Sequence, residues 1–206
     1  SPKDQIGTMT ENKRSVLFFD THPDDADWWS GGLAILLREK GWAVDFVCVA
    51  PAKENRGYAD ESASILGVTR HYLEIPVNDN DRFRGCLREA VLPLMETHKP
   101  DMVFIPAMTD YHREHVLVSK TLFSFFHWSA GLGLGEVEVY SCDSHETRDL
   151  VEIYIDVSSV WKKHMESLRC FKNFKCPTSK ENTLIRVKTG RAMMLGATIP
   201  SHASVD

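Results

Sequence analysis

Residues 15–32 read SVLFFDTHPDDADWWSGG and join a short apolar run to a polar turn and then to two glycines. The run 16–19 is short and is followed by turn residues, which predicts a buried strand rather than a helix. Pro23 fixes its own φ and keeps His22 out of the helical region, so the side chains of His22 and Asp25 can surround one point. Because open α/β sheets place their sites beyond the carboxyl ends of the strands, this turn is a candidate functional site.

The turn contains one imidazole and two carboxylates within four residues, at His22, Asp24 and Asp25. Such a set can bind a divalent metal and still leave one carboxylate to act as a base. The alternative is an Asp-rich loop whose only role is to cap the following helix. A metal site in this turn would need further ligands from elsewhere in the chain.

A second polar cluster, TDYHREH at residues 109–115, supplies candidate ligands. It follows the apolar run 102–105, which predicts another strand, and it precedes a helical pattern. If that helix has begun by His112, the spacing of three residues places His112 and His115 on one face. The second cluster therefore also lies between a strand and the start of a helix.

Strands and helices alternate along the chain, which predicts parallel βαβ units. The expected fold is α/β and Rossmann-like, with a doubly wound, mostly parallel sheet and helices on both faces. No G-x-G-x-x-G follows the first strand, so dinucleotide binding is disfavoured. Predicted strands cover 16–19, 42–50, 71–77, 102–105, 137–140 and 151–155; predicted helices cover 31–40, 58–66, 82–97 with a kink or break at Pro93, 116–128, 161–174 and 181–196.

Length and composition suit one soluble globular domain over residues 1–206, with residues 1–13 flexible. A net charge of −5 and a pI near 6.0 argue against a nucleic-acid partner. No apolar run approaches the roughly 18 residues that a membrane span requires. The five cysteines form no C-x-x-C motif and fit free thiols in a cytoplasmic protein.

The two motifs identify a resemblance to the LmbE/PIG-L superfamily of zinc-dependent N-acetylglucosaminyl deacetylases. Residues 22–26 read HPDDA where the family has HPDDE, and residues 112–115 read HREH where the family has HxDH. The segment DVS at 156–158, before a helix with lysines, resembles the family's DIS segment. The resemblance extends from about Arg14 to about Gly196, and relatives typically continue further, so we expect a shortened C-terminus.

The resemblance implies a role for each motif residue. His22, Asp25 and His115 would bind the metal, which would be Zn²⁺, with another divalent metal such as Fe²⁺ as the alternative. Asp24 would be the general base, and His112 would face the developing oxyanion. A further position, Glu114, would orient His112 or His115 from outside the ligand set.

The same resemblance gives candidates for substrate contact. Ala26 replaces a family glutamate beside the ligands, and Arg56 follows the second strand, where relatives carry substrate-binding residues. Two residues in polar turns complete the set, Asp79 in the run NDND and His145 after a predicted strand.

The expected substrate is a small N-acetylated molecule, an amino sugar or a conjugate that contains N-acetylglucosamine, from which the enzyme would remove acetate. One alternative is an amidase for a non-sugar N-acyl compound such as a natural-product intermediate. A second alternative is a descendant that binds a metal or ligand without catalysis. The sequence allows a homo-oligomer and does not specify one.

Overall fold

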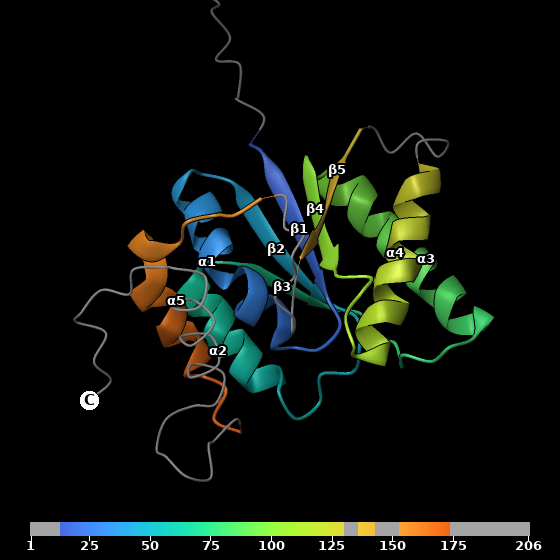
Figure 1. Ribbon diagram of the computed structural model, residues 1–206, viewed down its shortest axis with the longest axis horizontal. Coiled ribbons are helices and arrows are strands. Elements are labelled where there is room, and N and C mark those ends of the chain that lie inside the picture. The colour runs from blue at the N-terminus through green and yellow to red at the C-terminus, as the bar shows by residue number, and fades with distance from the viewer. Residues whose placement is uncertain (1–12, 130–135, 143–152, 174–206) are drawn as a thin grey trace, which may run out of the picture.

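The fold is built around a sheet of five parallel strands. The computed structural model describes residues 13–129, 136–142 and 153–173. Within these residues the strand order is β3-β2-β1-β4-β5, and every neighbouring pair is parallel (Figure 1). The strands are β1 (Ser15–Asp20), β2 (Ala43–Cys48), β3 (Thr69–Tyr72), β4 (Met102–Pro106) and β5 (Glu138–Cys142). The predicted α/β fold with a doubly wound parallel sheet is confirmed.

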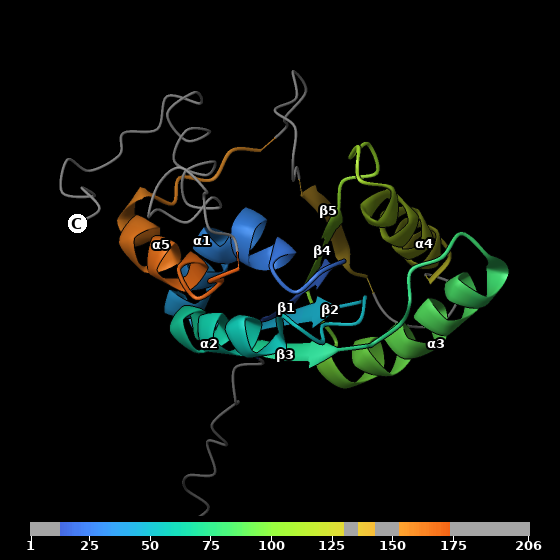
Figure 2. The same ribbon diagram turned by 90° about the horizontal axis from the view of Figure 1, so that it is seen from below.

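Helices cover both faces of the sheet, as predicted. Figure 2 shows α1, α2 and α5 on one face and α3 and α4 on the other. The helices are α1 (Asp25–Glu39), α2 (Arg56–Leu66), α3 (Asp81–His98), α4 (Arg113–Ser129) and α5 (Trp161–Leu168), with a short 3₁₀ helix, η2 (Ser158–Val160), before α5.

β1 lies at the centre of the sheet, and its side chains alternate between two apolar cores. Leu17 and Phe19 pack with residues of α3 and α4, whereas Val16 and Phe18 pack with residues of α1 and α2. All four side chains are buried. A continuous apolar run is what a parallel strand needs when helices cover both of its faces. The VLFF run therefore specifies the centre of the fold.

The strand order reverses at β1, because the chain continues from β1 to β2 and β3 on one side and returns to β4 and β5 on the other. β1 pairs directly with β4, with Phe18 opposite Phe104. The loops that follow these two strands therefore leave the same edge of the sheet side by side. Ligand sites in such folds lie at this reversal.

The first helix begins earlier than the sequence predicted, at Asp25 rather than Gly31. The carbonyl of Asp24 accepts a hydrogen bond from the Trp28 N–H, 3.0 Å away, which closes the first turn. Asp25 and Asp27 lie in that turn, where carboxylates interact favourably with the positive end of the helix dipole. Asp25 therefore lies on the helix rather than in a loop.

The glycines that were expected to start this helix lie inside it instead. A Cβ on Gly31 would come within 2.7 Å of the His164 ring, and a Cβ on Gly32 within 2.8 Å of Val157. The two glycines thus allow α1 to approach α5 and the segment before it closely. Their role is in packing between elements.

Three other expected elements differ in extent. β3 covers Thr69–Tyr72 instead of 71–77. Helix α3 continues through Pro93 without a break. Pro93 is exposed, so the carbonyl that loses its helical partner can be hydrated. Residues 153–155, expected in a strand, form none.

The expected helix 161–174 is realised as α5 and ends earlier, at Leu168. The expected helix 181–196 and His145 lie outside the described residues. Among the helices of the described part of the chain, none is long and apolar enough to cross a membrane.

Candidate metal centre and active site

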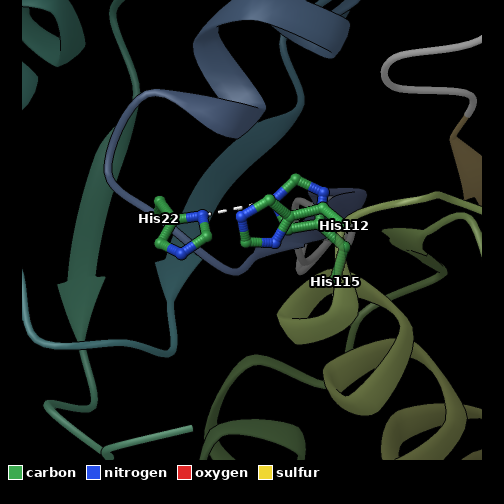
Figure 3. Close-up of side chains that lie close together, drawn as sticks. All are labelled: His22, His112 and His115. Atoms are coloured by element: carbon green, nitrogen blue, oxygen red, sulfur yellow. Dashed lines mark hydrogen bonds between the residues drawn. The ribbon is translucent and has the colours of Figure 1, made fainter.

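Three candidate ligands meet where the loops after β1 and β4 lie side by side. His22 Nδ1 lies 3.2 Å from His115 Nε2, and both nitrogens lie close to Asp25 Oδ2, at 3.3 and 3.2 Å. Figure 3 shows the His22 ring directed toward the His115 ring from the opposite loop. Three donor atoms from three side chains therefore form a nearly equilateral triangle.

The backbone around β1 holds Asp25 in place. Its Oδ2 accepts hydrogen bonds from the backbone N–H groups of Thr21 at 3.2 Å and His22 at 2.7 Å. The N–H of Asp25 in turn donates to the His22 carbonyl at 3.2 Å. These bonds form a tight turn that brings the His22 and Asp25 side chains to one point, as the sequence predicted.

Asp110, which is absent from the predicted site residues, orders the second loop. Its Oδ2 lies 2.9 Å from His115 Nδ1, and its Oδ1 accepts the His112 N–H at 2.8 Å. The Asp110 carboxylate is buried, and His115 is 1% exposed. Asp110 fixes the His115 ring so that Nε2 faces the triangle. The sequence signal that could have indicated this role is the position of Asp110, five residues before the candidate ligand His115.

His112 and Glu114 surround the triangle. His112 lies directly before α4, and its ring centroid is 5.1 Å from that of His22 and 4.5 Å from that of His115. One nitrogen from each of these three histidines lies within 4.8 Å of the others. Glu114 Oε2 lies 2.7 Å from His22 Nε2, so Glu114 contacts the histidine of the other motif. The sequence had predicted contact with His112 or His115.

Asp24 occupies a different environment from its neighbour Asp25. It is the N-cap of α1, but its side chain makes no capping hydrogen bond. Burial, with the charge of Asp25, raises the pKa of Asp24 to about 7. In Asp25 the pKa is lowered instead, because hydrogen bonds from His115 and His22 outweigh the effect of burial. One carboxylate is thus held ionised while the other is poised to exchange a proton near neutral pH.

The histidines respond to the same carboxylates. Burial alone would lower the pKa of His22, but the carboxylates of Asp25 and Glu114 raise it to about 9. The pKa of His115 is also raised, because Asp25 and Asp110 outweigh burial. Burial and then repulsion by the other two imidazoles lower the pKa of His112. The carboxylates around His22 and His115 therefore favour positive charge at this point of the structure.

A cavity of about 520 Å³ opens over the triangle. Besides the motif residues it is lined by the loop after β2, where Lys53, Glu54 and Asn55 form the rim. Of the residues after β2, the sequence had indicated only Arg56 as a substrate contact. The complete lining is His22, Pro23, Asp24, Asp25, Pro51, Ala52, Lys53, Glu54, Asn55, His112 and His115.

The other predicted substrate contacts do not line this cavity. Ala26 is 3% exposed and packs in the core between α1 and the sheet, so its side chain does not line the cavity. Arg56 pairs with Glu74 at 3.1 Å. Asp79 pairs with Arg84 at 2.6 Å. Of the predicted contacts, His145 cannot be placed, because it lies outside the described residues.

A buried arginine stabilises the loop that follows β1. Arg70, on β3, donates to the Pro23 carbonyl at 2.7 Å and also pairs with Asp27 and Asp20. Its guanidinium is 2% exposed. Asp27 also accepts a hydrogen bond from Ser62 of α2. Asp27 therefore stabilises the loop through Arg70 and Ser62, and it does not line the cavity.

Solved structures with a similar fold include a hydratase and several deacetylases. The 4-carboxy-2-hydroxymuconate hydratase GalB of Pseudomonas putida has a TM-score of 0.73 at 20% identity, over 89% of this chain and 86% of that one. The N,N'-diacetylchitobiose deacetylase of Pyrococcus horikoshii has a TM-score of 0.71 at 19% identity, over 90% and 79%. The teicoplanin deacetylase Orf2, in a zinc-inhibited form, has a TM-score of 0.66 at 12% identity, over 88% and 93%. At these identities the similarity shows the fold.

Sequence comparison identifies the family. No curated protein shows significant sequence similarity to the chain. The family PIG-L, described as GlcNAc-PI de-N-acetylase, matches residues 17–126. This match covers more than half of the chain and contains both loops of the candidate site. The chain belongs to the PIG-L family.

Proposed function

We propose that the protein is a metal-dependent hydrolase that removes the N-acetyl group from an amino sugar or from a conjugate that contains N-acetylglucosamine. The observation that carries the proposal is the triangle of His22 Nδ1, Asp25 Oδ2 and His115 Nε2 beneath an open cavity, with Asp24 beside it. Family membership and deacetylases of the same fold support it.

The donor triangle fits a zinc ion. Ligand atoms about 2.0–2.2 Å from a tetrahedral Zn²⁺ lie about 3.3–3.6 Å from one another. The three observed edges are 3.2–3.3 Å. Two imidazoles and one carboxylate are also a donor set of catalytic zinc sites, which leave a position open. Fe²⁺ is the alternative, because two imidazoles and one carboxylate with open positions also bind non-haem Fe²⁺. When bound, the metal supplies Lewis acidity that activates water near neutral pH and polarises a carbonyl.

Asp24 is proposed as the general base. It lines the cavity beside Asp25, where a carboxylate can accept a proton from water and later return one to the departing amine. His112, on the other side, would donate a hydrogen bond to the carbonyl oxygen as negative charge develops there. Its lowered pKa favours a neutral ring, which still carries one N–H donor.

Two carboxylates would position the histidines without touching substrate. Asp110 holds His115 by Nδ1 and fixes the backbone at His112. Glu114, from the start of α4, holds His22 by Nε2. Such contacts fix the tautomer and the ring orientation of a ligand histidine. In this arrangement Glu114 joins the two loops, a role that the longer glutamate side chain permits.

A substrate panel tests the reaction. Metal-loaded protein is incubated with N-acetylated amino sugars, with non-sugar N-acyl amines and with an unsaturated carboxylate, and acetate release and substrate hydration are measured. We expect acetate from an amino sugar. Acetate or acyl release only from the non-sugar compounds would favour the amidase alternative. Hydration without acetate release, or no reaction at all, would contradict the proposal.

Metal content tests the ligand set and separates an enzyme from a metal-free descendant. Purified protein should retain about one divalent metal per chain at this site, and His115→Ala should lose it. The exposed His127 of α4 provides the control, because His127→Ala should leave the metal content unchanged. Elemental analysis measures all three proteins. Equal metal in wild type and His115→Ala would remove His115 from the ligand set.

A further inference from the structure

A second group of metal-binding side chains lies away from the active site. Asp45 is in β2, His71 is in the neighbouring strand β3, and His98 is the last residue of α3. His71 Nε2 lies 2.9 Å from Asp45 Oδ1, and His98 Nδ1 lies 3.9 Å from Asp45 Oδ2. One donor atom from each of the three residues lies within 4.8 Å of the other two.

The Asp45 carboxylate is unusual for its place in the sheet. It is only 8% exposed, and it lies opposite the buried Leu17 of β1 and beside the buried Val47 two residues along its own strand. Within the described ranges its only ion-pair partners are the two histidines, and no Lys or Arg nitrogen lies within 4.0 Å. A buried carboxylate without a fixed positive charge is costly. Each of its oxygens instead faces one imidazole nitrogen.

We propose that Asp45, His71 and His98 form a second divalent-metal site, with Zn²⁺ as the preferred ion. Two imidazoles and one carboxylate suit Zn²⁺, whereas Ca²⁺ and Mg²⁺ require more oxygen ligands. The 2.9 Å between His71 Nε2 and Asp45 Oδ1 is already close to the distance of about 3.3–3.6 Å that separates two ligand atoms of one Zn²⁺. The His98 ring is 22% exposed at the end of a helix, so it can rotate to shorten the longer distance. Because the side chains of both histidines are partly exposed to solvent, an ion can reach the three ligands.

This site is distinct from the centre described above. Asp45 is the third residue of β2, whereas the active-site loops follow the carboxyl ends of β1 and β4. None of the three residues lines the active-site cavity. A metal here would join an edge strand, an inner strand and the end of α3. Its role would therefore be structural, and its removal should leave the catalytic loops in place.

Metal stoichiometry tests the proposal in the full-length protein. Chelated protein is dialysed against Zn²⁺, and bound zinc is measured for wild type, His71→Ala, His98→Ala and the control His127→Ala. We expect His71→Ala and His98→Ala each to bind one zinc fewer than wild type, and the control to bind the same number. This difference does not depend on whether the first site also binds zinc. Unchanged stoichiometry in both variants would overturn the proposal.

A measurement on the unmodified protein covers the case in which a variant does not fold. In a Zn²⁺ titration, imidazole ¹⁵N resonances of His71 and His98 should shift together, with saturation at a stoichiometric ratio. His127 should not shift. If the His71 and His98 resonances stay in place while Zn²⁺ saturates the protein, the cluster is a hydrogen-bonded pair with a neighbouring histidine, and the proposal is wrong.

Discussion

At the scale of single residues, adjacent carboxylates behave differently because their surroundings differ. Asp25 receives two backbone N–H bonds and faces two imidazoles, so its pKa is lowered. Asp24 lines the cavity without a capping bond, and burial together with the charge of Asp25 raises its pKa to about 7. When the surroundings move the pKa values of two neighbouring carboxylates apart, the two groups can serve as a metal ligand and as a base. The family resemblance assigned different roles to the two aspartates, and the local hydrogen bonds give the physical reason for that difference.

Asp24→Asn should retain the metal and the fold but lose most of the turnover. The amide has nearly the same shape as the carboxylate but cannot accept the proton from water. A general base contributes about 10²–10⁴-fold to the rate. Steady-state kinetics and metal analysis of the same preparation measure both effects. Near-normal turnover at saturating metal would exclude Asp24 as the base and make Glu114 the next candidate.

Ala26→Glu should destabilise the protein without creating a new ligand or substrate contact. Ala26 is 3% exposed and packs against the sheet, so the new carboxylate would be buried without a partner. An uncompensated buried charge costs about 3–5 kcal/mol. Urea denaturation measures the loss, with Ala26→Ser as a smaller polar control. Full stability together with altered metal affinity would show that position 26 reaches the metal.

At the scale of elements, the packing of α1 against α5 depends on Gly31. The His164 ring lies where a Cβ of residue 31 would be, and its Nε2 is held by the Asp27 carbonyl at 2.7 Å. His164 is 1% exposed and has little space to move. The sequence pattern predicted that the two glycines start the helix, because their packing partners, Val157 and His164, lie more than 120 residues away along the chain.

Gly31→Ala should therefore destabilise the protein, although alanine favours a helix. Gly57 of α2 is the matched control, because a Cβ there meets nothing within 4 Å. Gly57→Ala should be neutral or stabilising by up to about 1 kcal/mol, the difference in helix propensity. Gly31→Ala should instead lose about 1–3 kcal/mol, the usual cost of overpacking. Thermal or urea unfolding compares the two. Equal stability changes would mean that α5 shifts freely away from α1.

At the scale of the whole molecule, periodicity and local motifs predicted most of the architecture. The runs at β1, β2 and β4 indicate buried parallel strands, and the strand order then places the two motifs together. The predicted start of the first helix was wrong, because the acidic residues before the glycines form the first turn of α1. The predicted extent of β3 was wrong as well, because only Thr69–Tyr72 pairs with β2 at the edge of the sheet. Arg70 was not predicted because its partners, Pro23 and Asp27, are far away in the sequence. Asp110 was not predicted because only the geometry of its loop brings its carboxylate to His112 and His115.

The distance along the chain between the two motifs has a kinetic consequence. His22 and His115 are separated by 93 residues, so their nitrogens meet only after β4 has paired with β1 across two intervening βα units. A metal that needs both cannot stabilise a folding nucleus made from either part alone. In a stopped-flow comparison, added metal should slow unfolding and leave the folding rate nearly unchanged, because contacts absent from the transition state act on the unfolding limb. Faster folding with metal would mean that β1 and β4 meet early, and that the ion helps to choose the order in which the sheet assembles.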